Sequence, residues 1–306
     1  MSDEGVSLKT LSPRALAWQR RGRAAAAAWR EFSSSKSGLV GLGVLVLAVL
    51  LALLAPVLSN EDGLDVTKAT GGRMRPPDGN FWLGTDVDGR SILLLTWWGT
   101  RVSLLIGISA ALLSVVIGTV IGIIAAHYGR WVSAVLLRIV DFFLVLPSLV
   151  LAIALSTVLE PGIGTIIVAI GLTSWPSAAR LVRAQTLTVE ARPYIERSRA
   201  LGGGNLHIIV KHVLPAVLPL VFVNATLAVG NAIVAESTLA FLGLGDPFQT
   251  SWGGILHNAT VDSAALAGAW WYLLPPGVAI GVVVLAFTLC GRALETVLNP
   301  RLREPR

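Results

Sequence analysis

Cysteine and lysine are both scarce in this sequence of 306 residues. The one cysteine, Cys290, excludes an intramolecular disulfide bond and a thiolate metal site, and its apolar surroundings predict a small packing residue. None of the four lysines follows a glycine, so the Gly-Lys-Ser/Thr loop that holds nucleotide phosphates is missing. We therefore expect a protein that is not an enzyme and does not hydrolyse ATP by that route.

Other chemical motifs are missing as well. The four histidines form no H-E-x-x-H pattern and have no thiolate partners, and there is no G-x-S-x-G elbow. We expect no metal and no cofactor bound by this chain. The net charge of +6 does not indicate nucleic acid, because the basic residues cluster beside apolar runs instead of alternating with aromatics.

Charge of either sign is also scarce, at 14% of residues, whereas 54% are hydrophobic and the mean hydropathy is +0.72. These values indicate an all-α integral membrane protein. A bilayer core needs about 20 apolar residues in a helix. Six runs fit that template, at residues 38–58, 102–126, 133–159, 162–179, 214–236 and 275–294.

The distribution of lysine and arginine predicts the orientation, because cytoplasmic segments collect them. Basic residues crowd the stretch before the first run, the segment 190–215 and the stretch after the last run, while the loop 241–274 has none. We expect both termini in the cytoplasm. The predicted parts are a tail 1–37, a first helix 38–58, an outer loop 59–101, a core 102–294 with five helices, and a tail 295–306.

The run 13–32 has an alanine-rich middle, which favours a helix. It also contains two tryptophans and the arginines Arg20, Arg21, Arg23 and Arg30. It is predicted to lie on the inner membrane surface as an amphipathic helix. The alternative is a basic tail that serves only as a topology signal.

Two predicted spans carry features of helix packing. Ser114, Gly118 and Gly122 fall four apart and predict a close approach by another helix. In the next span Arg138 and Asp141 are three residues apart and can pair with each other, either to fix helix packing or to act in a gate. Pro147, further along the same span, permits a kink.

The fifth span is the most polar. Asn224 and Asn231 share a helix face and Thr238 extends the line, which indicates either a translocation path or hydrogen bonds between helices. Glu236, at the end of this span, is predicted to reach the outer interface.

The segment 190–215 is charged and punctuated by glycines. Pro193 suits the first turn of a helix that continues to Leu201, and three glycines from Gly202 are predicted to stop it. Ile195, Ser198 and Leu201 are predicted to share one side of this helix, and Glu196 and Arg199 to pair on another.

A second short helix is then expected from Asn205 to Lys211, before Pro215 starts the fifth span. The product is a rigid helical knob that can pass a partner's movement to the membrane helices. An ordinary basic loop lying on lipid headgroups is the alternative.

This segment resembles the EAA loop of the permease subunits of ABC importers, written E-A-A-x3-G-x9-I-x-L-P. Glu196, Gly202, Leu214 and Pro215 match. The two alanines are replaced by Arg197 and Ser198, and the isoleucine by His212.

Further segments resemble the C-type subunit of the dipeptide, oligopeptide and nickel permease family, from about residue 38 to the C-terminus. They are Trp82-Leu83-Gly84-Thr85-Asp86 with Asp88-Gly89-Arg90, Arg138-Ile139-Val140-Asp141 with Leu146-Pro147-Ser148, and Phe241-Leu242-Gly243-Leu244-Gly245 with Ser251-Trp252-Gly253.

The resemblance implies a type I, MetI-like importer fold in a bacterial cell membrane and half of a translocation path for peptides or similar solutes. It implies a B-type permease partner, two ATP-binding subunits or one fused ATPase that use ATP and Mg, and an external solute-binding protein. That protein would meet the outer loops, with Trp270, Trp271 and Tyr272 as anchors. The residues expected to couple to the ATPase are Tyr194, Ile195, Glu196, Arg197, Ser198, Arg199, Ala200, Leu201 and Gly202.

Two other classes remain open. A secondary transporter driven by an ion gradient would be expected to carry ionisable pairs near the membrane midplane, and this sequence offers little beyond Arg138 and Asp141. A scaffold that anchors a cytoplasmic partner without transport would need the knob but not the polar fifth span.

Overall fold

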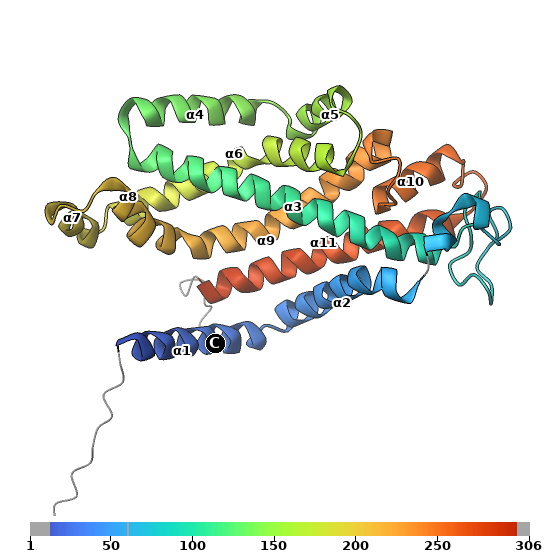
Figure 1. Cartoon of the computed structure of the whole chain (residues 1–306), viewed down its shortest axis with the longest axis horizontal. Helices are drawn as coiled ribbons and strands as arrows, with labels where there is room; N and C mark the ends of the chain where they lie inside the picture. Colours follow the sequence, from blue (N-terminus) through green and yellow to red (C-terminus); the bar gives the residue numbers. More distant parts are fainter. Residues whose placement is uncertain (1–12, 60, 299–306) are drawn as a thin grey trace, which may run out of the picture.

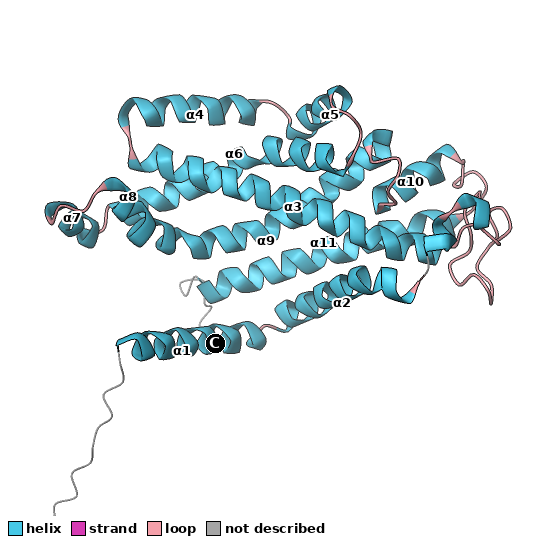
Figure 2. Ribbon diagram, viewed as in Figure 1, coloured by secondary structure: helices cyan, strands magenta, loops and turns pink. Residues whose placement is uncertain are grey.

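The computed structural model describes residues 13–59 and 61–298, and this part of the chain is helical, with one isolated bridge between Thr85 and Ser91 (Figures 1 and 2). The parts of the predicted tails 1–37 and 295–306 that come before Pro13 and after Leu298 lie outside it. The helices are α1 (Pro13–Ser34), α2 (Lys36–Leu58), α3 (Ile92–His127), α4 (Arg130–Val145), α5 (Ser148–Val158), α6 (Ile163–Glu190), α7 (Pro193–Ala200), α8 (Asn205–Ile208), α9 (Leu214–Leu239), α10 (Trp252–Val261) and α11 (Trp270–Leu298).

The predicted third span is broken in two. Among the described residues, five helices are long and apolar enough to cross a membrane, and α4 with α5 makes a sixth if the bent pair counts as one span. The two halves are bent by 88° at Pro147, which has no N–H to continue the helical ladder. The predicted kink is confirmed, and the six-span prediction holds with this broken pair as the third span.

Several helices extend beyond the apolar runs that predicted them. Helix α3 has 36 residues, about 54 Å at 1.5 Å per residue, and begins ten positions before the predicted start at Val102. Helix α11 begins at Trp270 and contains both Pro275 and Pro276. A bilayer core of ~30 Å is shorter than α3, so the end of this helix projects past it.

Helices α3 and α6 pack through small residues. A Cβ added at Gly118 would lie 2.6 Å from the Ala178 Cβ, and one added at Gly122 would lie 2.6 Å from the Ala179 carbonyl oxygen. Ser114 is buried on the same face of α3. The predicted small-residue face is therefore confirmed, and α6 is the helix that approaches it.

The N-terminal part packs against the last helix. Phe32 of α1, Cys290 and Ala293 form a small buried cluster, and Cys290 is confirmed as a packing residue. Helix α1 forms as expected over Pro13–Ser34. Its position on the membrane surface stays a prediction.

The predicted break between a short helix at Asn205 and a span starting at Pro215 is wrong. One continuous helical element of 40 residues runs over Asn205–Leu244. A π-helical turn, Ile209–Val213, joins α8 to α9, and the Leu214 N–H donates to the Ile209 carbonyl five residues back. In a regular α-helix the Pro215 ring would meet the carbonyl of residue 211, and the wider π turn accommodates it.

Candidate coupling and translocation sites

Helix α7 forms a knob at one end of the molecule, between the ends of α6 and α8 (Figure 1). Pro193 lies in its first turn, and Ile195 is its buried residue. Gly202 has a φ of +84°, and the amides of Gly202 and Gly203 donate to the carbonyls of Arg199 and Ser198. Both the predicted start and the predicted glycine stop are confirmed.

The predicted side-chain contacts within the knob are wrong. Arg199 pairs with Glu190 of α6 at 2.9 Å instead of with Glu196, which is exposed. Leu201 is 82% exposed and does not share the buried side of Ile195. Glu190 also contacts His127, so one carboxylate ties the end of α3 to α6 and to the knob.

The outer surface of the knob carries a cavity of about 530 Å³. Three rings lie along it, with centroids 5.9 Å apart between Tyr194 and His212 and 5.8 Å between His212 and His207. The cavity is lined by Tyr194, Arg197, Ser198, Leu201, Gly202, Gly203, Gly204, His207 and His212. The three positions that depart from the EAA pattern, residues 197, 198 and 212, therefore all line this surface.

A second cavity, of about 480 Å³, lies between α3, α6, α9 and the break at Pro147, and we call it the polar groove. Asn224 and Asn231 both line it, as does Ser177 of α6. Thr238 does not; its hydroxyl donates to the Val234 carbonyl of its own helix at 2.8 Å. The structure thus keeps the two asparagines of the predicted stripe together and removes the threonine.

The predicted pair between Arg138 and Asp141 is not formed. The Asp141 Oδ1 lies 2.6 Å from an amino group of Arg180 on α6, 39 residues along the chain. Helices α4 and α6 pack against each other, which brings Arg180 opposite Asp141, while Arg138 is exposed.

Glu236 does not reach an outer interface, because its side chain is fully buried. Ser103 of α3 donates to one carboxylate oxygen at 3.1 Å, and the hydroxyl of Ser237 lies 3.2 Å from the same oxygen. The Ser103 hydroxyl in turn accepts the backbone N–H of Trp252 at the start of α10. Glu236 therefore joins α3, α9 and α10, and sequence spacing gave no sign of these partners.

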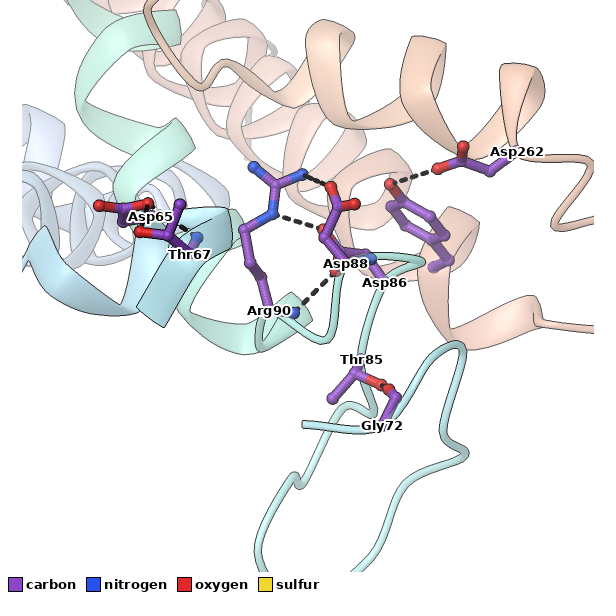
Figure 3. A network of polar contacts seen from close by, with 9 residues as sticks. Asp65, Thr67, Gly72, Thr85, Asp86, Asp88, Arg90 and Asp262 are labelled. Atoms are coloured by element: carbon purple, nitrogen blue, oxygen red, sulfur yellow. Dashed lines mark hydrogen bonds and ion pairs between the residues drawn. The ribbon is translucent and has the colours of Figure 1, made fainter. Parts of the chain in front are cut away.

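The predicted outer loop is folded around Asp86 (Figure 3). This fully buried carboxylate accepts the backbone N–H of Asp88 and of Arg90 and pairs with the Arg90 guanidinium at 2.7 Å. Burial raises the pKa of the Asp86 carboxyl, and the charge of Arg90 opposes that shift. A Cβ at Gly89 would lie 2.3 Å from the Gly71 carbonyl oxygen, so the first family-like motif is explained by the folding of this loop.

The last family-like motif, which includes Ser251-Trp252-Gly253, fixes the position of α10. Ser251 caps this helix by accepting the Gly254 N–H, and the buried indole of Trp252 donates to the Thr96 carbonyl. A Cβ at Gly253 would lie 2.4 Å from the Ser237 carbonyl oxygen. These residues seat α10 against α3 and α9.

The predicted aromatic anchors differ from one another. Trp270 is 54% exposed, as an anchor requires. Tyr272 is buried, and its hydroxyl lies 3.2 Å from Asp262, so it cannot serve as an exposed contact. Trp271 donates to the Thr85 carbonyl and links α11 to the outer loop.

Residues 118–304 match the family described as the binding-protein-dependent transport system inner membrane component. The chain belongs to this family. Residues 25–77 also match the N-terminal transmembrane domain of oligopeptide transport permease C.

The similarity to known permeases covers nearly the whole of this permease. It is 36% identical to the dipeptide transport system permease protein DppC of Bacillus subtilis over 278 residues, 90% of this chain and 85% of that protein. It is 38% identical to a putative peptide transport system permease protein of Brucella suis, over 90% of this chain and 91% of that protein. It is 35% identical to the oligopeptide transport system permease protein OppC of B. subtilis, over 90% of each.

Membership confirms the resemblance, the MetI-like all-α fold and the role as the membrane-spanning subunit of an ABC importer. The permease is a multi-pass membrane protein of a transporter family, not of an enzyme family. The open alternatives of a secondary transporter and a scaffold are accordingly wrong.

Proposed function

We propose that this permease forms half of a translocation path for peptides or similar small solutes and is driven through α7 by cytoplasmic ATPase subunits. One observation carries the coupling part of this proposal. Seven of the eight residues of α7 are not buried, yet the helix is held in place by Ile195 and by the link from Arg199 to Glu190. A helix that is both well anchored and largely uncovered suits a partner surface.

The polar groove supports the transport part. Asn224 and Asn231 come from α9, which is joined through a π turn to α8, the helix next to the knob. Side-chain amides that face a cavity are hydrated there, whereas in hydrocarbon they would need a neighbouring helix. The groove belongs to one subunit, so a second permease subunit of the B type would complete the path.

The other partners and the orientation follow from the same reasoning. The knob and both termini would face the cytoplasm, and the loops around Asp86 and α10 would face an external solute-binding protein. ATP and Mg would be bound by the partner ATPases, and this chain would bind no cofactor of its own. Relatives transport dipeptides and oligopeptides according to their names, which makes peptides the favoured solutes.

Reconstitution of the permease with its partner subunits and binding protein in vesicles tests the proposal. Uptake of a labelled tripeptide should require ATP. Glu196→Ala should lower uptake about tenfold, as expected for one important contact residue. It should leave the fold intact, because Glu196 is exposed.

Gly202→Pro should abolish coupling, since proline cannot adopt a φ of +84°. Gly204→Pro is the matched control, because the φ of Gly204 is −70°, close to the value that proline requires. Uptake that does not depend on ATP, or that is reduced equally by the two proline substitutions, would contradict the coupling role of α7.

A further inference from the structure

The ion pair between Asp141 and Arg180 lies just beyond the polar groove. Arg180 follows Ser177 by three residues on α6, and Asp141 precedes Leu144 by three residues on α4. Ser177 and Leu144 both line the groove. Residues three apart share a helix face, so each charged residue extends a face of the groove by a little under one turn, ~4.5 Å.

The direction of that extension is toward the knob. Helix α4 starts and α6 ends near the contact between His127 and Glu190, at the α7 end of the molecule (Figure 1). Asp141 is N-terminal to the groove residues of α4, and Arg180 is C-terminal to those of α6. The pair therefore stands between the groove and α7, at the mouth through which a solute would leave toward the cytoplasm.

The pair is the place where the lining changes character. The described residues that line the groove carry no charge, whereas Asp141 and Arg180 carry opposite charges and keep 44% and 57% of their side chains exposed. Charged side chains within membrane helices almost always face a water-filled cavity or a protein partner instead of lipid. An ion pair left this open is accessible to a passing solute.

We propose that Asp141 and Arg180 act as a charge-selective mouth that favours zwitterionic solutes, such as peptides with both termini free, over solutes with a single charge. This inference rests on the proposed function. A solute with one charge can replace only one partner and leaves the other unpaired, which is costly away from bulk water. A zwitterion offers a carboxylate to Arg180 and an ammonium to Asp141 and leaves neither unpaired.

The test uses the assembled transporter and needs neither ATP nor transport. Ser177→Cys is placed in the groove in a Cys290→Ala background, and its labelling is timed with a cationic trimethylammonium and an anionic sulfonate methanethiosulfonate. Asp141→Asn should shift the rate ratio toward the anionic reagent, and Arg180→Gln should shift it toward the cationic one. Each shift should be about tenfold, the size expected for one charge at helix-turn distance in a partly hydrated site.

The exchange Asp141→Arg with Arg180→Asp should return the ratio to that of the parent, because the pair is re-formed. Ser37→Cys, at the exposed start of α2 and outside both the groove and the knob cavity, is the reference and should respond to none of these changes. If Cys290→Ala weakens the fold, the parent cysteine can stay, because it is only 4% exposed and its labelling can be measured alone.

Protection by solute completes the experiment. Trialanine with free termini should slow labelling of the Ser177→Cys protein, and N-acetyl-trialanine amide should not. Equal protection by the two peptides, or a reagent ratio that ignores residues 141 and 180, overturns the inference. A transporter that shows the expected ratios but takes up no peptide with ATP would instead contradict the proposed function.

Discussion

Gly202 gives a sharp test of the knob, because two nearby glycines differ in one property. Gly202 has a φ of +84°, whereas Gly204 has a φ of −70° and a ψ of 163°. A Cβ added at either position would meet no atom within 4 Å. Replacing each by alanine therefore adds no clash, and the backbone conformation alone decides the outcome.

The magnitude follows from two opposing effects. An L-residue in the left-handed region costs about 1–2 kcal/mol. Alanine also restricts the unfolded chain, which returns about 0.4–1 kcal/mol. Gly202→Ala should therefore weaken the local structure by roughly 1 kcal/mol, about a fivefold increase in the opened population. Gly204→Ala should be close to neutral, because the gain from the unfolded state is offset by the poorer helix N-cap that alanine makes at this position.

Hydrogen exchange, measured by mass spectrometry on peptides that cover α7, reports the population in which this helix is open. Amides of α7 should exchange about fivefold faster in Gly202→Ala than in the parent protein. Their rates should change little in Gly204→Ala, and peptides from α3 should be unaffected in both. If the two variants exchanged alike, the left-handed glycine would not be what ends α7.

Three further predictions concern the helix packing and the outer loop. Gly118→Ala should lower stability by about 1–3 kcal/mol in thermal unfolding, because its Cβ would meet the backbone of α6, and Gly43→Ala, with no atom within 4 Å, should not lower it. Glu236→Ala should lower the free energy of unfolding by about 3 kcal/mol, because it empties a buried site. An equal loss of stability in Glu236→Gln would show that the charge of the side chain matters more than its shape. Since burial raises the pKa of Asp86, the folded loop binds the proton more tightly than the unfolded chain. The stability of the parent relative to Asp86→Asn should fall as the pH rises from about 4 through that raised pKa, and an advantage that grows with pH would contradict this reasoning.

Hydropathy and turn chemistry were enough to predict the helical spans, the kink at Pro147 and the left-handed stop at Gly202. Each depends on residues close together in the chain. The same approach missed the true start of α3 at Ile92, because Arg101 interrupts the apolar pattern, whereas the helix extends before it through a largely apolar stretch. It also missed the continuity across Pro215, which depends on a π turn that no simple periodicity shows.

The errors in the candidate sites have a common physical cause. The rule that pairs residues three or four apart predicted partners on one helix, whereas Asp141 and Arg199 found theirs on α6. Glu236 is bonded to Ser103, 133 positions away, and only the packing of α9 on α3 brings them together. Charged side chains in a membrane protein take the partner that burial provides, and that partner is set by tertiary structure.

The long helical element from Asn205 to Leu244 has a mechanical consequence. At 1.5 Å per residue its 40 residues measure about 60 Å, enough to pass from one side of a bilayer to the other. It begins beside α7, carries Asn224 and Asn231, and holds Glu236 near the start of α10. Between the π turn and the non-helical backbone of Gly243, α9 is a regular helix, so a rotation or axial shift applied at its start would be carried to Glu236 and the start of α10. The timing of events on the two sides of the membrane would then be set by a single helix.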